Sequence, residues 1–146
     1  MTLATEQFNR RLLRARDAMD RTYAEPLDVA RLAAIACLSE AHFIRSFRAT
    51  FGETPHRYLQ RRRVERAMFL LTETDRDVTA ICLDVGFTSL GTFSRTFREI
   101  VGESPTSYRK RAPIVVGPTC FLMAAMRPSS FGEAASRNGN LGSAHV

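Results

Sequence analysis

The stretch FIRSFRATFGETP at residues 43–55 returns as FSRTFREIVGESP at residues 93–105. Eight residues of this region, counting the tyrosine that follows each stretch, find identical partners at a constant offset of fifty. Upstream, where Asp28 matches Asp77, the offset is forty-nine, so one additional residue enters the second copy near Thr88. Two copies are too few for a solenoid, which needs about three. A duplicated supersecondary unit is the better interpretation.

Each copy is predicted to form a short helix, a tight turn and a second helix, which together make a helix-turn-helix unit. Residues with N-capping side chains precede all four helices, namely Asp28, Ser39, Asp77 and Ser89. A turn at Cys37 and Leu38 joins the first pair, and Gly86 supplies a left-handed turn for the second pair. Gly52 and Gly102 end the two second helices.

Two longer helices complete the predicted fold. Apolar residues at three- and four-residue steps predict one helix from about Thr5 to Ala24. The other begins at Pro55 and runs between the two copies to Glu73. We therefore expect an all-α fold with two helix-turn-helix subdomains joined by a shared central helix. The expected parts are the N-terminal helix and first unit at 5–54, the central helix at 55–75, the second unit at 76–112, and a partly disordered tail at 113–146.

The charge of the chain favours a polyanionic partner. Its 146 residues include 21 Lys+Arg against 15 Asp+Glu, and the pI is near 10.0. Such a surface attracts nucleic acid, and salt weakens the attraction. Lys110 is the only lysine. The planar fork of arginine suits phosphates and the guanine edge, while a GC-rich genome is the alternative source of this arginine bias.

The cysteines and histidines show no pattern typical of a metal or redox site. Cys37, Cys82 and Cys120 are odd in number and far apart, so neither a disulfide framework nor a zinc site is expected. No cofactor is implied. Cys37 and Cys82 lie in apolar stretches and are expected in the core. The N-terminus lacks a signal-peptide core, and no run is long enough to span a membrane. We expect a cytoplasmic protein.

A helical projection separates two faces on the second helix of each unit. In the first unit the inward face carries Phe43 and Phe47 with Glu40, Ser46 and Thr50, and the outward face carries Ala41, Ile44, Arg45 and Arg48. In the second unit Phe93 and Phe97 point inward, and Gly91, Ser94, Arg95 and Arg98 point outward. The phenylalanines are expected in the core, and the outward faces are expected to meet the partner.

The outward arginines are the candidate DNA contacts. Arg45 and Arg95 stand at matching places in the early turns, which enter the major groove in helix-turn-helix proteins. There an arginine can bond guanine O6 and N7 together; a solvated or ion-paired arginine is the alternative. Arg48 and Arg98, one turn further on, are expected to contact phosphate or to form an internal ion pair. The run Arg61–Arg63 is expected to be a solvated charged face, with phosphate contact as the alternative.

The length of the predicted central helix allows one chain to reach two grooves. About nineteen residues span about 28 Å, and successive major grooves on one face of B-DNA lie about 34 Å apart. We therefore expect a monomer to place two reading helices in adjacent grooves of double-stranded DNA. RNA polymerase is expected as a further partner.

Several stretches carry a family signature. They are ICLDVGFTS at 81–89, FSRTFR at 93–98 and GESPTSYR at 102–109 in the second unit, and SEAHFIRSF at 39–47 and GETPHRYL at 52–59 in the first. In these stretches the chain resembles the AraC/XylS family of bacterial transcription regulators, from about Phe8 to Arg111. The resemblance implies seven helices, and sequence-specific DNA binding that regulates transcription.

The resemblance also implies base-contacting positions. They are Ala41, Ile44 and Arg45 in the first unit and Leu90, Gly91, Thr92, Ser94 and Arg95 in the second. Four of these residues are apolar or small and cannot form paired base bonds, so methyl contacts or shape readout would have to serve. Cys37 stands where the family commonly has glycine. Many members carry a further sensing or dimerising domain, so this chain resembles the short stand-alone kind or a fragment of a longer regulator.

Regulation of transcription through duplex DNA is the leading hypothesis, and we expect the first unit to set the sequence preference. The alternative is a protein-interaction module that sequesters or tethers another regulator, with the apolar stretch at 114–126 docking on that partner. An enzyme is not expected, because Cys120 has no nearby histidine or metal-ligand cluster to activate it.

Overall fold

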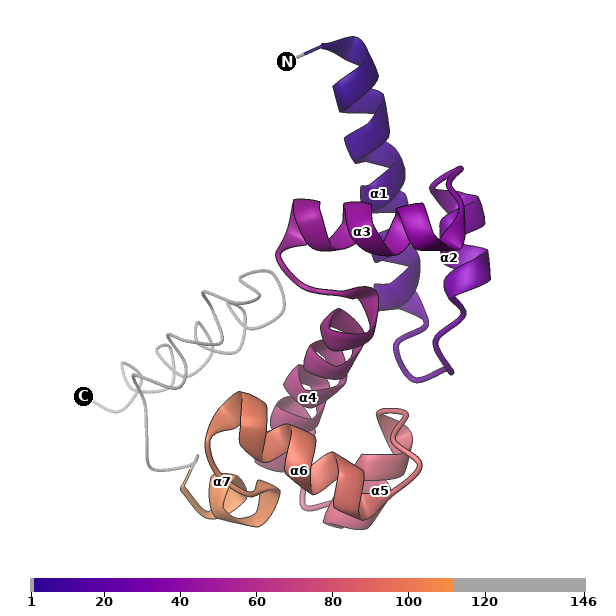
Figure 1. The fold of residues 1–146 in the computed structure, drawn as a ribbon. Coiled ribbons are helices and arrows are strands. Elements are labelled where there is room, and N and C mark those ends of the chain that lie inside the picture. Colours follow the sequence, from indigo (N-terminus) through magenta and orange to yellow (C-terminus); the bar gives the residue numbers. More distant parts are fainter. Residues whose placement is uncertain (1, 112–146) are drawn as a thin grey trace, which may run out of the picture. The chain divides into compact units, whose positions relative to one another are not determined.

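The computed structural model describes residues 2–111, which contain seven α-helices and no strand (Figure 1). The helices are α1 (Leu3–Arg21), α2 (Val29–Ile35), α3 (Glu40–Phe51), α4 (Pro55–Glu73), α5 (Val78–Asp84), α6 (Leu90–Val101) and α7 (Pro105–Arg111). The expected all-α fold is confirmed for this part of the chain. The tail expected at 113–146 lies outside the described residues.

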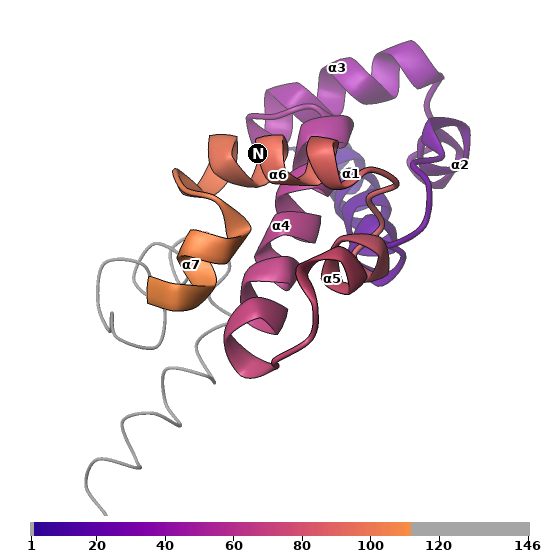
Figure 2. The same ribbon diagram turned by 90° about the horizontal axis from the view of Figure 1, so that it is seen from below.

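The chain up to Pro105 forms one compact body, and the residues from Thr106 on belong to a second. Within the body that ends at Pro105, α1, α2 and α3 pack on one another and on the first turns of α4. The helices α5 and α6 pack on each other and on α4. Figures 1 and 2 both show α2 beside α3 and α5 beside α6. The helix α4 is therefore shared by both helix-turn-helix units, as expected.

The duplication holds at the level of whole helices. The bounds of α2 and α5 differ by forty-nine residues at both ends, and those of α3 and α6 by fifty. The turn accordingly takes residues 36–39 in the first unit and 85–89 in the second. Both turns use the left-handed region, with φ of 58° at Cys37 and 102° at Gly86. The additional residue predicted near Thr88 is thus confirmed.

Three of the four predicted capping side chains accept a hydrogen bond from the backbone. Asp28 Oδ1 accepts from the N–H of Arg31 at 3.0 Å, and the hydroxyls of Ser39 and Ser89 cap α3 and α6 in the same way. The prediction for Asp77 was wrong, because its side chain makes no capping bond. Its carbonyl still accepts the first helical hydrogen bond of α5, and an ion pair between Arg76 and Asp84 bridges the two ends of that helix.

Four phenylalanines orient the second helices, as predicted. Phe43, Phe47, Phe93 and Phe97 are fully buried. Within each helix the two rings lie 5.7 Å apart between centroids, a spacing at which aromatic pairs attract. Ser46 is also buried, but Glu40 and Thr50 are exposed and were wrongly placed inward. They stand at the two ends of α3, where the core no longer covers that face.

The two described cysteines differ in environment. Cys82 is buried as expected, and burial raises the pKa of its thiol. Cys37 was expected in the core but is exposed. Its left-handed backbone ends α2 and turns the chain away from the core, so the apolar neighbours in the sequence do not cover it. Cys120 lies outside the described residues.

No helix within residues 2–111 combines the length and the apolar character needed to cross a membrane.

Replacing Gly102 by alanine should destabilise the fold by roughly 1–2 kcal/mol, because a side chain strains the left-handed conformation. Its φ is +95° at the end of α6. Gly91 in the same helix is the matched control: only Ser89 Oγ, at 3.6 Å, would meet its Cβ. Gly91→Ala should stabilise by up to about 1 kcal/mol. Urea unfolding followed by circular dichroism measures both changes, and a shift of the same sign in both variants would contradict this role of Gly102.

Candidate nucleic-acid interface

The candidate residues on α3 form an exposed edge. Ala41, Ile44, Arg45 and Arg48 are all exposed, whereas the phenylalanines of the opposite face are buried. Ile44 keeps 38% of its surface accessible, so this edge presents an apolar side chain between its arginines and Ala41. Ala41, Ile44 and Arg45 lie in the first half of α3, which Ser39 caps, and Arg48 lies in its last turn.

The helix α6 repeats this arrangement. The exposed candidates are Leu90, Gly91, Thr92, Arg95 and Arg98, and Ser94 is partly exposed. Leu90, the first helical residue, keeps 44% of its surface accessible. The structure thus brings the predicted site residues of each unit together on one edge of one helix.

The four outward arginines are not engaged by the described part of the protein. No residue within 2–111 forms a hydrogen bond or ion pair with the side chain of Arg45, Arg48, Arg95 or Arg98. The internal ion pair considered for Arg48 and Arg98 is therefore absent among the described residues. All four residues are exposed, so their guanidiniums are accessible to an anionic partner.

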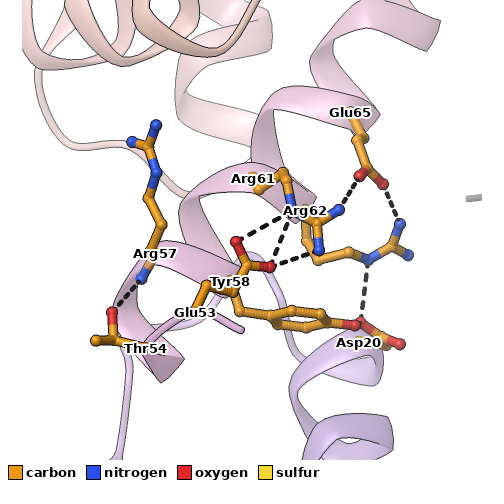
Figure 3. A network of polar contacts seen from close by, with 8 residues as sticks. All are labelled: Asp20, Glu53, Thr54, Arg57, Tyr58, Arg61, Arg62 and Glu65. Atoms are coloured by element: carbon orange, nitrogen blue, oxygen red, sulfur yellow. Dashed lines mark hydrogen bonds and ion pairs between the residues drawn. The ribbon is translucent and has the colours of Figure 1, made fainter. Parts of the chain in front are cut away.

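The run Arg61–Arg63 behaves differently from what the sequence indicated. Arg61 donates to Glu53 Oε1 and to Glu65 Oε1, each at 2.6 Å (Figure 3). Arg62 donates to Glu65 Oε2 at 2.6 Å and to Asp20 Oδ1 at 3.0 Å. The expected solvated face was wrong for Arg61 and Arg62, because these side chains turn toward carboxylates of the protein itself.

Glu65 is the centre of this network and was missed in the sequence. Its side chain is 1% exposed and faces both guanidiniums, as Figure 3 shows. Burial raises the pKa of its carboxyl, and the hydrogen bonds and charges of Arg62 and Arg61 act against that shift. Its spacing after Arg61 and Arg62, four and three residues, was the available signal, since such pairs meet on a helix surface.

The network continues into α1. Tyr58, on the first turns of α4, donates its hydroxyl to Asp20 Oδ1 at 2.8 Å, the same oxygen that accepts from Arg62. Glu53 comes from the turn between α3 and α4. One polar cluster therefore connects α1 with α4 and with the turn that follows α3. It fixes the position of α3 relative to α1 and α4.

A second, weaker link joins α4 to α6. Arg57 and Glu99 form an ion pair at 3.6 Å, with 41% and 56% of their side chains exposed. Exposed pairs of this kind contribute little to stability.

Within residues 2–111, no group of three histidine, cysteine or acidic side chains stands close enough to hold a metal ion.

Comparison with known proteins gives consistent findings. A family model described as a helix-turn-helix domain matches residues 32–111. The probable transcriptional regulator LumQ of Photobacterium leiognathi is 35% identical over 83 residues. The DNA-binding domain of AdpA, whose crystal structure is in complex with a target DNA, is 33% identical, with a TM-score of 0.65 over 70% of this chain and 95% of that one. A transcriptional regulator of Chromobacterium violaceum with an AraC-type DNA-binding domain is 28% identical, with a TM-score of 0.68 over 74% and 96%.

The curated relatives are much longer than the matched region. The LumQ match covers 57% of this chain but 34% of LumQ, and another curated regulator is covered over 13% of its length. The structural relatives, by contrast, are covered almost completely. The likeness therefore concerns the helix-turn-helix region.

Replacing Glu65 by alanine should destabilise the protein by roughly 3 kcal/mol, because two half-buried guanidiniums lose a buried counter-ion. Glu99→Ala is the matched control on the exposed pair and should cost less than about 1 kcal/mol. Urea denaturation gives the free energy of unfolding of each variant, and the two losses of stability are compared. Equal small losses in both variants would mean that the Glu65 cluster does not hold the first unit together.

Proposed function

Because this chain belongs to the family of AraC-type helix-turn-helix domains, we propose that it binds double-stranded DNA at specific sequences and so regulates transcription. The observation that carries the proposal is the repeated edge of α3 and α6. At matching places both helices expose an arginine, Arg45 and Arg95, that no described residue engages. The family is one of DNA-binding domains and not of enzymes.

The AdpA domain supports the choice of partner. That protein was crystallised with a target DNA, and nearly its whole DNA-binding domain aligns with this chain. The net charge of +6 agrees with a polyanionic partner. A protein-interaction module is not favoured, because the matching family model and the related regulators indicate DNA binding. The apolar stretch expected to dock on a partner, 114–126, lies outside the described residues.

We assign roles to the site residues by their chemistry. Arg45 and Arg95 pair with guanine through O6 and N7. Ala41, Ile44 and Leu90 contact thymine methyl groups, while Gly91 allows close approach of the backbone. Thr92 and Ser94 offer hydroxyls to bases or phosphates. Arg48 and Arg98, one turn further from the N-terminus of each helix, bind phosphate.

The two units of one chain read adjacent major grooves in this proposal. The helix α4 has nineteen residues and is about 28 Å long, comparable with the spacing of about 34 Å between successive major grooves on one face of the duplex. One monomer then occupies one bipartite site. We propose RNA polymerase as a further partner, and the cytoplasm, at the nucleoid when DNA is bound, as the location of the protein.

Arg45→Ala and Arg95→Ala test base reading. Each should weaken binding to the preferred duplex by about 5- to 150-fold, equivalent to roughly 1–3 kcal/mol, and relax the preference at one base position. Fluorescence anisotropy with the preferred duplex and with random duplex measures both effects. Arg66→Ala, an exposed arginine of α4 that packs on Phe69 of its own helix, is the control and should bind as the unchanged protein does.

An equal loss of affinity for the preferred duplex and for random duplex would contradict base recognition by Arg45 or Arg95. Absence of any DNA binding by the unchanged protein at low salt would overturn the proposed function itself.

Arg48→Ala tests the phosphate role. This variant should bind preferred and random duplex more weakly by similar factors, and the slope of log affinity against log salt should fall by about 1. A salt titration of both duplexes gives the slopes. If the slope stays unchanged while one base position loses its preference, then Arg48 reads a base instead.

A further inference from the structure

Arg63 has no carboxylate partner among the described residues but is firmly held. Its Nε donates to the carbonyl of Tyr23 and its Nη2 to the carbonyl of Glu25, each at 2.7 Å. Both carbonyls belong to the connection between α1 and α2, about forty residues earlier in the chain. Charge-assisted hydrogen bonds of this length are among the stronger ones. Arg63 therefore binds α4 to the α1–α2 connection of the first unit.

The same guanidinium also contacts the second unit. It lies 5.8 Å from the centroid of the Phe87 ring, within the range of a cation–π interaction. Phe87 is 5% exposed and follows Gly86 in the turn between α5 and α6. The side chain of Arg63, on the shared helix α4, thus contacts both the α1–α2 connection and the turn between α5 and α6.

The turn of the second unit lies directly against the first unit. A Cβ on Gly86 would come within 2.8 Å of the Ala24 carbonyl oxygen and 2.9 Å of Arg63 Nε. Real Cβ atoms do not approach backbone oxygens so closely, so only glycine fits here. Gly86 therefore has two reasons to be glycine: its left-handed φ of +102° and this close approach.

We propose that Arg63 and Gly86 form a clamp that fixes the distance and angle between α3 and α6, and thereby sets the spacing of half-sites that one chain accepts. The inference rests on the proposed function, since it assumes that both helices read DNA. If the two helix-turn-helix units are held rigidly, binding of the first unit to DNA places the second unit at its groove. The second unit then binds without a further loss of translational and rotational entropy. Arg63 is a positioning residue in this view, not a base contact.

Selection of bound sites from a random-sequence duplex pool tests the clamp. The unchanged protein and Arg66→Ala, the control on the same helix, should both select two half-motifs at a single spacing. Arg63→Ala should select the same half-motifs at several spacings, because the units can then turn relative to each other. Its affinity for the spacing preferred by the unchanged protein should fall about tenfold.

Arg63→Met is the second variant, since it keeps the aliphatic stem over Phe87 but loses both donors. Circular dichroism and thermal unfolding establish that a variant is folded at the binding temperature, and Arg63→Met takes the place of Arg63→Ala if the latter is not. Selection by the folded variant of one unchanged spacing, at unchanged affinity, would overturn the clamp while leaving two-groove reading intact. Selection of a single half-motif by the unchanged protein would overturn two-groove reading, and the clamp with it.

Discussion

The Glu65 carboxylate is buried in the first unit, and a buried charge is tolerated only beside an opposite one. Arg61 and Arg62 supply that charge from the preceding turn of α4. Each of these arginines then binds a second carboxylate, Glu53 or Asp20. The polar face of α4 is in this way turned inward onto α1 and onto the turn after α3. The placement of the first reading helix depends on this chain of contacts.

The arginines of the run Arg61–Arg63 and those of the two outward edges fall into three groups according to the partners that lie within reach. Arg61 and Arg62 meet carboxylates and serve the fold. Arg63 meets only backbone carbonyls and an aromatic ring, and joins the two units. The outward arginines of α3 and α6 meet no described partner. Of these three groups, only the last keeps the full hydrogen-bonding capacity that recognition of a phosphate or a guanine edge requires.

The duplication and its local signals were enough to predict the helices, the shared position of α4 and the outward edges of α3 and α6. Those features depend on periodicity, caps and glycines, which act over a few residues. The pairing of Arg61 and Arg62 with Glu65 had a local signal in their spacing. The contacts of Arg62 with Asp20 and of Arg63 with the α1–α2 connection had none, because these partners lie about forty residues away. The exposure of Cys37 likewise depends on where the turn points in space. The sequence indicates which edges of α3 and α6 face outward. The clamp between the two helix-turn-helix units is visible only in the three-dimensional structure.

Occupation of two adjacent grooves by one chain is tested most directly by hydroxyl-radical footprinting on a selected duplex, with the stoichiometry taken from sedimentation. We expect one chain per duplex and two protected patches on the same face, about ten base pairs apart. One protected patch per bound chain, or two patches that appear only when two chains are bound, would contradict reading of both grooves by a monomer.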